Sequence, residues 1–115
     1  MTDTGSGVMQ AAGLDHRIGP LDAIPRGEGR VFSVGGQRMA VFRTHADEVF
    51  ATQERCPHLA GPLADGLIDG ATVICPLHDR VYDLRSGSGV NTDCRVQTYP
   101  AHVGADRVVV VTLAM

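Results

Sequence analysis

The sequence lacks the features of three large classes of protein. It has no run of about 18 apolar residues, so no transmembrane helix is expected. The first residues, 1–5, lack both the basic start and the apolar block of a secretory signal, which predicts a cytoplasmic location and no membrane contact. Basic charge is not in excess either, because 10 Lys and Arg stand against 13 Asp and Glu, for a net charge of −3. Surfaces that bind nucleic acid are basic, so no nucleic-acid partner is expected.

Cysteine is scarce, and its number is odd. Of the three cysteines, Cys56 and Cys75 fall in short clusters with histidine. Cys94 then has no partner left, so a disulfide framework is not expected, in agreement with a reducing compartment. We expect Cys94 to be a small buried apolar residue.

No long helical pattern is present, and 115 residues provide for one domain. Fourteen glycines and six prolines separate short apolar runs, which indicates strands and turns. The sequence therefore predicts an all-β fold, a small antiparallel β sandwich, over residues 16–115. A flexible N-terminal tail is expected at residues 1–15. An inserted subdomain that carries the cysteine–histidine clusters is expected at about residues 55–87.

The expected strands follow the apolar runs and the turn residues between them. Gly35 and Gly36 supply the positive φ values of a two-residue hairpin, and a second hairpin is expected to turn at Asp69 and Gly70. The run at residues 107–113 is rich in β-branched residues and favours a strand. The predicted strands are 16–18, 30–34, 37–43, 48–52, the two arms of 67–74, 82–84 and 107–113.

Two short clusters of metal-ligand residue types organise the chain. The first is Cys56-Pro57-His58, and the second is Cys75-Pro76-Leu77-His78. Thiolate sulfur and imidazole nitrogen suit zinc, copper and iron, and two such turns facing each other make a four-ligand cage. Two Cys and two His form a structural zinc site. They also hold a 2Fe–2S cluster in which two His replace two Cys on one iron.

The residues around the ligands favour the two-iron cluster over zinc. A proline follows each cysteine, and Gly61-Pro62 stiffens the first loop. Histidines that must reach an outer iron need rigid loops of this kind. A zinc finger would usually continue from its ligands into an amphipathic helix, and no such helix is evident.

With these flanks the chain resembles the Rieske 2Fe–2S proteins over about residues 16–113. The resemblance rests on the two boxes, residues 56–63 and 75–78, and on the segment 82–87 behind them. It implies one cluster per chain, with Cys56 and Cys75 on the inner iron and His58 and His78 on the outer iron. It also implies a set of neighbours that shape the surroundings of the cluster: Leu59, Gly61, Pro62, Pro76, Leu77, Arg80 and Tyr82.

The same resemblance predicts a low-to-intermediate reduction potential. High-potential members carry an extra cysteine in each box, joined in a disulfide, and a serine two residues after the second histidine. Here Gly61 and Leu77 stand at the cysteine positions and Arg80 at the serine position. Tyr82 does match the tyrosine that donates to a cysteine sulfur. We expect a potential in the lower half of the Rieske range of about −150 to +300 mV.

The absence of a long catalytic domain indicates a small electron carrier with no catalytic residue of its own. Segments 24–30, 39–43 and 93–100 resemble the small subunit of NAD(P)H-dependent nitrite reductase of nitrate assimilation. That resemblance implies one-electron transfer during reduction of nitrite to ammonium. It also implies a large partner subunit bearing sirohaem and flavin, or another redox protein. The alternatives are a Rieske ferredoxin that feeds a ring-hydroxylating dioxygenase, an orphan Rieske ferredoxin, a metal-free scaffold and a structural zinc-binding module.

Overall fold

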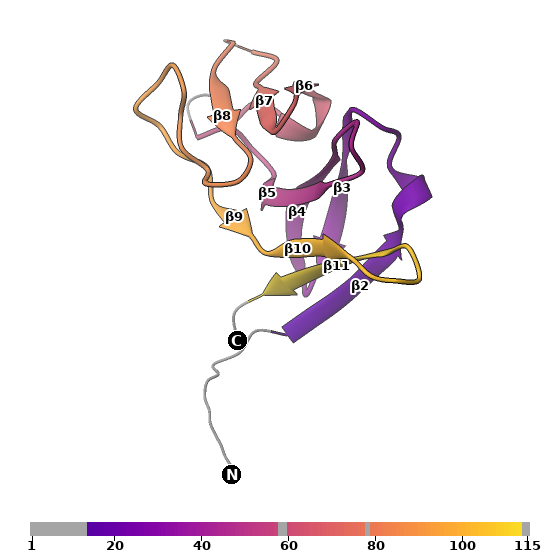
Figure 1. The fold of residues 1–115 in the computed structure, drawn as a ribbon. Coiled ribbons are helices and arrows are strands. Elements are labelled where there is room, and N and C mark those ends of the chain that lie inside the picture. Colours follow the sequence, from indigo (N-terminus) through magenta and orange to yellow (C-terminus); the bar gives the residue numbers. More distant parts are fainter. Residues whose placement is uncertain (1–13, 58–59, 78, 114–115) are drawn as a thin grey trace.

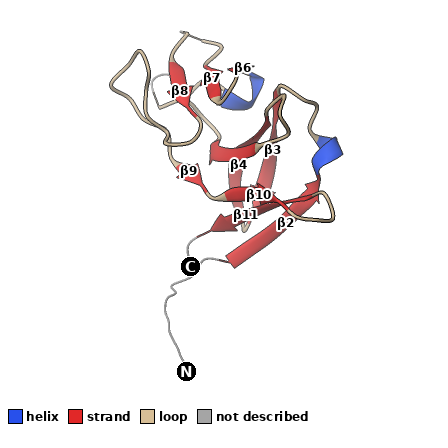
Figure 2. Ribbon diagram, viewed as in Figure 1, coloured by secondary structure: helices blue, strands red, loops and turns tan. Residues whose placement is uncertain are grey.

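The computed structural model describes residues 14–57, 60–77 and 79–113, which form three small antiparallel sheets (Figure 1). Helix is limited in these ranges to two short 3-10 turns, and none of it is long and apolar enough to cross a membrane (Figure 2). The all-β prediction is therefore confirmed. The elements are β2 (Leu14–Pro20), η1 (Leu21–Ala23), β3 (Glu28–Val34), β4 (Gln37–Arg43), β5 (Val49–Gln53), η2 (Leu63–Asp65), β6 (Leu67–Asp69), β7 (Thr72–Ile74), β8 (Val81–Asp83), β9 (Thr98–Tyr99), β10 (Ala101–Val103) and β11 (Val108–Leu113).

The central sheet has the strand order β3-β4-β5-β9 and contains the predicted glycine hairpin. Val34 pairs with Gln37 across the turn, so the loop is two residues long. Gly35 and Gly36 occupy it with φ values of 57° and 80°. Only glycine adopts such values without a steric penalty, which is why this pair fixes the register of β3 and β4.

Strand β4 is buried on both faces and separates two apolar cores. Side chains of a strand alternate between its faces. Met39 and Val41 accordingly pack into one core, while Ala40 and Phe42 pack into the other. All four are fully buried. The uninterrupted apolar run of β4 is thus explained by its position as the middle layer of the molecule.

The base sheet, β10-β11-β2, covers the face of β4 that carries Met39 and Val41. Val109 and Val111 of β11 supply the facing side chains. β2 pairs with β11 from Leu14 onward, so this strand begins two residues before the predicted start at residue 16. Residues 1–13 of the predicted tail lie outside the described residues.

The other face of β4 carries the inserted segment, at the end of the molecule away from β2 and β11 (Figure 1). β5 and β9 pair with each other, with Ala51 opposite Tyr99. The chain between them, residues 54–97, leaves the central sheet and forms the third sheet, β6-β7-β8. The segment extends beyond the predicted end at residue 87, because bridges join Gly89 to Tyr82 and Arg95 to Ser88.

Besides shifts of one or two residues at the ends of β3, β5, β8 and β11, two further details of the strand prediction are wrong. The β6–β7 hairpin turns at Gly70 and Ala71, one residue later than predicted, because Asp69 pairs with Thr72 and Gly70 takes the positive φ of 59°. β9 and β10 were not predicted. Each is at most three residues long, and they are separated only by Pro100, so neither shows a strand pattern of its own.

Candidate metal centre

The first cluster of ligand residue types lies in a tight loop directly after β5. The Cys56 amide donates to the Gly61 carbonyl at 2.8 Å, and the Ala60 amide donates to the Cys56 carbonyl at 2.7 Å. Ala60 closes the loop with a φ of 57°, a value that costs a non-glycine residue conformational energy. Two backbone hydrogen bonds therefore tie Cys56 to Ala60 and Gly61, the residues that end the loop.

The second cluster lies in a loop with the same hydrogen-bond pattern. The Cys75 amide donates to the Arg80 carbonyl at 2.7 Å, and the Asp79 amide donates to the Cys75 carbonyl at 3.2 Å. Asp79 has a φ of 55°, at the position that corresponds to Ala60. The two loops thus share one backbone design, in which the cysteine comes first and a left-handed residue follows four positions later.

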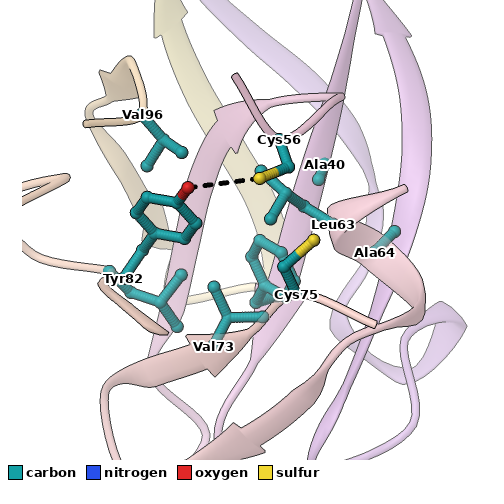
Figure 3. Close-up of a cluster of buried hydrophobic side chains, with 10 residues drawn as sticks. Ala40, Cys56, Leu63, Ala64, Val73, Cys75, Tyr82 and Val96 are labelled. Carbon is teal, nitrogen blue, oxygen red and sulfur yellow. Dashed lines mark hydrogen bonds between the residues drawn. The ribbon is translucent and has the colours of Figure 1, made fainter. Parts of the chain in front are cut away.

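Both cysteine side chains enter the same buried cluster from these two loops (Figure 3). Their exposed fractions are 2% for Cys56 and 1% for Cys75, and Leu63 and Val73 lie in the same cluster. No disulfide joins the three cysteines. Cysteine sulfur is a ligand of soft metal centres, so two cysteines that enter one buried cluster from two loops are candidate ligands of a single centre.

Gly61 lets the first loop approach the second. A Cβ atom on Gly61 would lie 2.9 Å from Cys75 Sγ and 3.0 Å from Leu77 Cγ. Such distances are too short for a side chain, so a residue without a Cβ is required for this contact. Leu77 lies across Gly61 and is itself half exposed. The two loops are therefore in direct contact at Gly61 and Leu77.

Tyr82 of β8 points its hydroxyl at one of the two sulfurs. The Tyr82 Oη atom lies 3.1 Å from Cys56 Sγ, and the side chain is fully buried (Figure 3). Burial, and then the hydrogen bond to Cys56, raises the pKa of Tyr82 well above its usual range. The hydroxyl therefore stays protonated at physiological pH, and it can donate to a thiolate at residue 56.

The remaining predicted residues fall in three groups. His58, Leu59 and His78 lie outside the described residues, so the two imidazoles are not placed here. Pro62 bridges to Arg55 at the base of the first loop. Pro76 is exposed at the tip of the second loop, and Arg80 is half-buried at its end.

Two further side chains contact these loops and were not predicted. Arg55 Nη1 donates to the Ala60 carbonyl at 3.3 Å. Asn91 Nδ2 donates to the Asp79 carbonyl at 3.0 Å, while Asn91 Oδ1 accepts from the Val81 amide at 2.9 Å. Neither an exposed arginine nor an exposed asparagine belongs to a motif, so no sequence signal pointed to these two contacts.

Comparison with protein families identifies the domain type. The family model described as the Rieske [2Fe-2S] domain matches residues 16–106. The ferredoxin component of a naphthalene 1,2-dioxygenase/salicylate 5-hydroxylase system from Ralstonia sp. is 32% identical over 90 residues. That match covers 76% of this chain and 86% of the relative.

Solved structures show the same fold. A Mycobacterium tuberculosis protein assigned as a NADH-dependent nitrite reductase small subunit superposes with a TM-score of 0.83, covering 90% of this chain and 97% of that chain, at 20% identity. NirD from E. coli superposes with a TM-score of 0.76, covering 89% of this chain and all of that one, at 25% identity.

Proposed function

Because the chain belongs to the Rieske [2Fe-2S] domain family, whose cofactor is a 2Fe–2S cluster that transfers electrons, we propose that Cys56, His58, Cys75 and His78 are its four ligands. The observation that supports this assignment is the pair of matched loops. Each loop begins with a buried cysteine, and the two loops touch at Gly61. In the sequence, a histidine follows the cysteine of each loop by two or three positions. Because the family's cofactor is a 2Fe–2S cluster, we set aside the alternative of a structural zinc site.

The bound cluster supplies one-electron redox chemistry, and the chain supplies rigidity and a dry surrounding. Hydrogen bonds within each loop restrict the movement of Cys56 and Cys75. Once Cys56 binds the cluster as a thiolate, the Tyr82 hydroxyl, 3.1 Å from its sulfur, is the donor and stabilises negative charge on that sulfur. Small structural change between the two charge states favours rapid transfer of single electrons.

The ligand assignment is tested by changing His58 or His78 to Ala, with His102→Ala as the control. His102 is an exposed histidine of β10 in the base sheet. Metal analysis of the wild type and the control should give two irons and two acid-labile sulfides per chain, with a Rieske electron-paramagnetic-resonance spectrum. Each ligand variant should lose that spectrum. A full Rieske signal in either variant would refute the assignment, and a colourless wild type that contains zinc would refute the iron–sulfur proposal.

We further infer that the electron acceptor is the large subunit of an NAD(P)H-dependent nitrite reductase, which bears flavin and sirohaem. The support is the resemblance of segments 24–30, 39–43 and 93–100 to nitrite reductase small subunits. The match to NirD, over 89% of this chain and all of NirD at 25% identity, adds to it. Reduction of nitrite to ammonium takes six electrons, which a one-electron carrier can deliver one at a time. The role belongs to nitrate assimilation and calls for a cytoplasmic protein.

A second acceptor is favoured by a different observation. The Ralstonia relative, at 32% identity over most of both chains, is the ferredoxin component of an aromatic dioxygenase system. In that case the chain would carry electrons to an oxygenase that adds hydroxyl groups to an aromatic ring.

Stopped-flow oxidation of the reduced protein separates the two acceptors. The dithionite-reduced protein is mixed with a sirohaem nitrite reductase large subunit or with a ring-hydroxylating oxygenase, each from the same organism as this chain. The nitrite reductase assignment predicts rapid oxidation by the first acceptor, and faster ammonium production when the carrier is added. Rapid oxidation by the oxygenase alone would replace that assignment with the ferredoxin role.

A further inference from the structure

The segment after Gly87 folds back along the outer edge of β8. The Val90 amide donates to the Val81 carbonyl at 2.8 Å, and Gly89 bridges to Tyr82. β7 pairs with β8 on the opposite side. The residues that follow the second ligand loop are therefore paired on both edges, once by β7 and once by this segment.

The backbone pairing along β8 ends at Val90, and the side chain of Asn91 makes the next hydrogen bonds. Its Oδ1 accepts from the Val81 amide at 2.9 Å, and its Nδ2 donates to the Asp79 carbonyl at 3.0 Å. A carboxamide has the same acceptor and donor as a peptide group. Asn91 thus binds the groups on either side of Arg80 in the way that a peptide unit of a neighbouring strand would bind them.

Asp79 is the residue of the second loop that most needs such support. It holds a φ of 55°, which a non-glycine residue keeps only when its surroundings enforce it. The equivalent residue of the first loop, Ala60, has its carbonyl bound by the Arg55 side chain at 3.3 Å. Each left-handed residue of the metal centre is therefore held by one side-chain donor. The donor of the first loop is Arg55, which directly precedes Cys56, and the donor of the second loop is Asn91, in the segment after Gly87.

The turn that presents Asn91 is itself well fixed. A Cβ on Gly89 would lie 2.3 Å from the Thr92 carbonyl oxygen and 2.5 Å from that of Cys94, so the chain turns tightly there. Arg95 Nη1 donates to Ser88 Oγ at 3.2 Å, and Arg95 Nη2 donates to the Ser86 carbonyl at 3.1 Å. These contacts join the two ends of the segment 86–95 and so help to keep the Asn91 carboxamide beside the second ligand loop.

We propose that Asn91 is a positioning residue of the metal centre, which fixes the loop that carries Cys75 and His78 in the geometry required to bind the cluster. The proposal rests on the ligand assignment made above. Residues that orient metal ligands from outside the ligand set typically change metal affinity about 10- to 100-fold when they are removed. Loss of Asn91 is therefore expected to weaken retention of the cluster without unfolding the domain.

The test compares Asn91→Ala and Asn91→Asp with Asp93→Ala. Asp93 is an exposed residue two positions after Asn91 and serves as the control. Asn91→Ala removes both hydrogen bonds, and Asn91→Asp keeps the shape while it places a carboxylate oxygen against the Asp79 carbonyl. Both should lose iron to a chelator roughly 10-fold faster than the wild type or more, with a shifted electron-paramagnetic-resonance spectrum. Asp93→Ala should match the wild type.

Exchange of the Val81 amide hydrogen in the metal-free protein gives a readout that needs no cluster. It should accelerate in Asn91→Ala and stay unchanged in Asp93→Ala. Wild-type chelation rates and spectra in both Asn91 variants would overturn the proposal, and so would an unchanged Val81 exchange rate in Asn91→Ala. Should Asn91→Ala fail to fold, the chelation rate and spectrum of the isosteric Asn91→Asp decide whether the proposal stands. Failure of the ligand assignment can be told apart from failure of this proposal, because His78→Ala would then retain its Rieske spectrum.

Discussion

The contact between Tyr82 and Cys56 predicts how one hydroxyl tunes the cluster. Reduction adds negative charge, and a donor to the thiolate stabilises that charge. Tyr82→Phe keeps the ring in its buried site and removes the 3.1 Å contact with sulfur. If about 1 kcal/mol of differential stabilisation is lost, the midpoint potential should fall by roughly 40 mV. Protein-film voltammetry measures this shift.

Tyr99→Phe is the matched control, because Tyr99 is the one other tyrosine in the sequence and contacts Gln37 in the central sheet. Its potential should equal that of the wild type, which we expect in the lower half of the range of about −150 to +300 mV. An unchanged potential in Tyr82→Phe would mean that the hydroxyl only fills space.

The close approach at Gly61 leads to a second prediction about a single residue. Gly61→Ala would place a methyl group 2.9 Å from Cys75 Sγ, so one of the two loops must move. Overpacking of this kind costs about 1–3 kcal/mol, and here it acts on a proposed ligand. The variant should incorporate less iron and unfold at a lower denaturant concentration.

Gly104→Ala is the comparison for Gly61→Ala. At Gly104 the nearest atom to an added Cβ is the carboxylate oxygen of Asp106, at 2.9 Å, and both residues lie between β10 and β11 of the base sheet and not in a ligand loop. Normal iron content is expected there. Full iron content in Gly61→Ala would show that the loops tolerate a wider separation.

At the residue scale, residues that belong to a ligand motif could be predicted from the sequence, whereas a residue placed only by the fold could not. Cys56 and Cys75 fall in short clusters with histidine, so their spacing marked them as candidate ligands, and the resemblance to Rieske proteins pointed to Tyr82. Asn91 could not be predicted in this way. Any side chain of suitable length that has a hydrogen-bond donor could bind the Asp79 carbonyl, and its position depends on how the segment after Gly87 folds.

At the scale of elements, a network of charges fixes the connection between β4 and β5. Asp47 accepts from Arg43 Nε at 2.9 Å and from Arg26 Nε at 2.9 Å. Arg43 is buried and also donates to the carbonyl of Ile24 at 2.9 Å, beside η1. The hydrogen bonds from Arg26 and Arg43 hold the pKa of Asp47 well below its usual range.

This depressed pKa predicts the acid dependence of stability. A carboxylate whose pKa is lowered by folding contributes stability that is fully present above its unfolded pKa of about 3.9, and this contribution is lost as the pH falls further. Asp47→Asn should therefore be less stable than the wild type at neutral pH, and the difference should shrink as the pH falls from about 4 toward 2. Asparagine tolerates the φ of 64° at this position, so backbone strain does not obscure the comparison.

Urea unfolding at a series of pH values measures the effect. Asp69→Asn is a suitable control, because Asp69 is an exposed residue at the end of β6. Its stability difference from the wild type should not depend on pH in the same way. A constant difference between Asp47→Asn and the wild type across the acid range would contradict the role given to the ion pairs.

The elements themselves were predictable where one turn or one pattern determines them. Gly35 and Gly36 set the β3–β4 register, and residues 108–113 of the predicted β-branched run 107–113 form β11. β9 and β10 exist because neighbouring strands pair with them: Thr98 and Tyr99 bind β5, and residues 101–103 bind β11. Such strands depend on tertiary contacts, and a local pattern does not reveal them.

At the scale of the whole molecule, β4 divides the protein into two cores with different dependence on the cofactor. One core contains Cys56, Cys75 and Tyr82, together with Val73 of β7. The other contains Val109 and Val111 of the base sheet, and neither of the two described ligand candidates, Cys56 and Cys75, belongs to it. Folding free energy derived from cluster binding therefore acts mainly on the first core.

Removal of the cluster should loosen one end of the molecule and leave the other intact. In hydrogen–deuterium exchange of the metal-free protein, amides of β7 and β8 should exchange faster by on the order of 10-fold or more, since local opening there is no longer opposed by the metal centre. Amides of β2 and β11 should keep their protection, because 14–20 and 108–113 pair with each other along their length. A uniform loss of protection would show that the two cores unfold as one unit. Protection unchanged throughout would show that the chain forms the metal centre before the cluster binds.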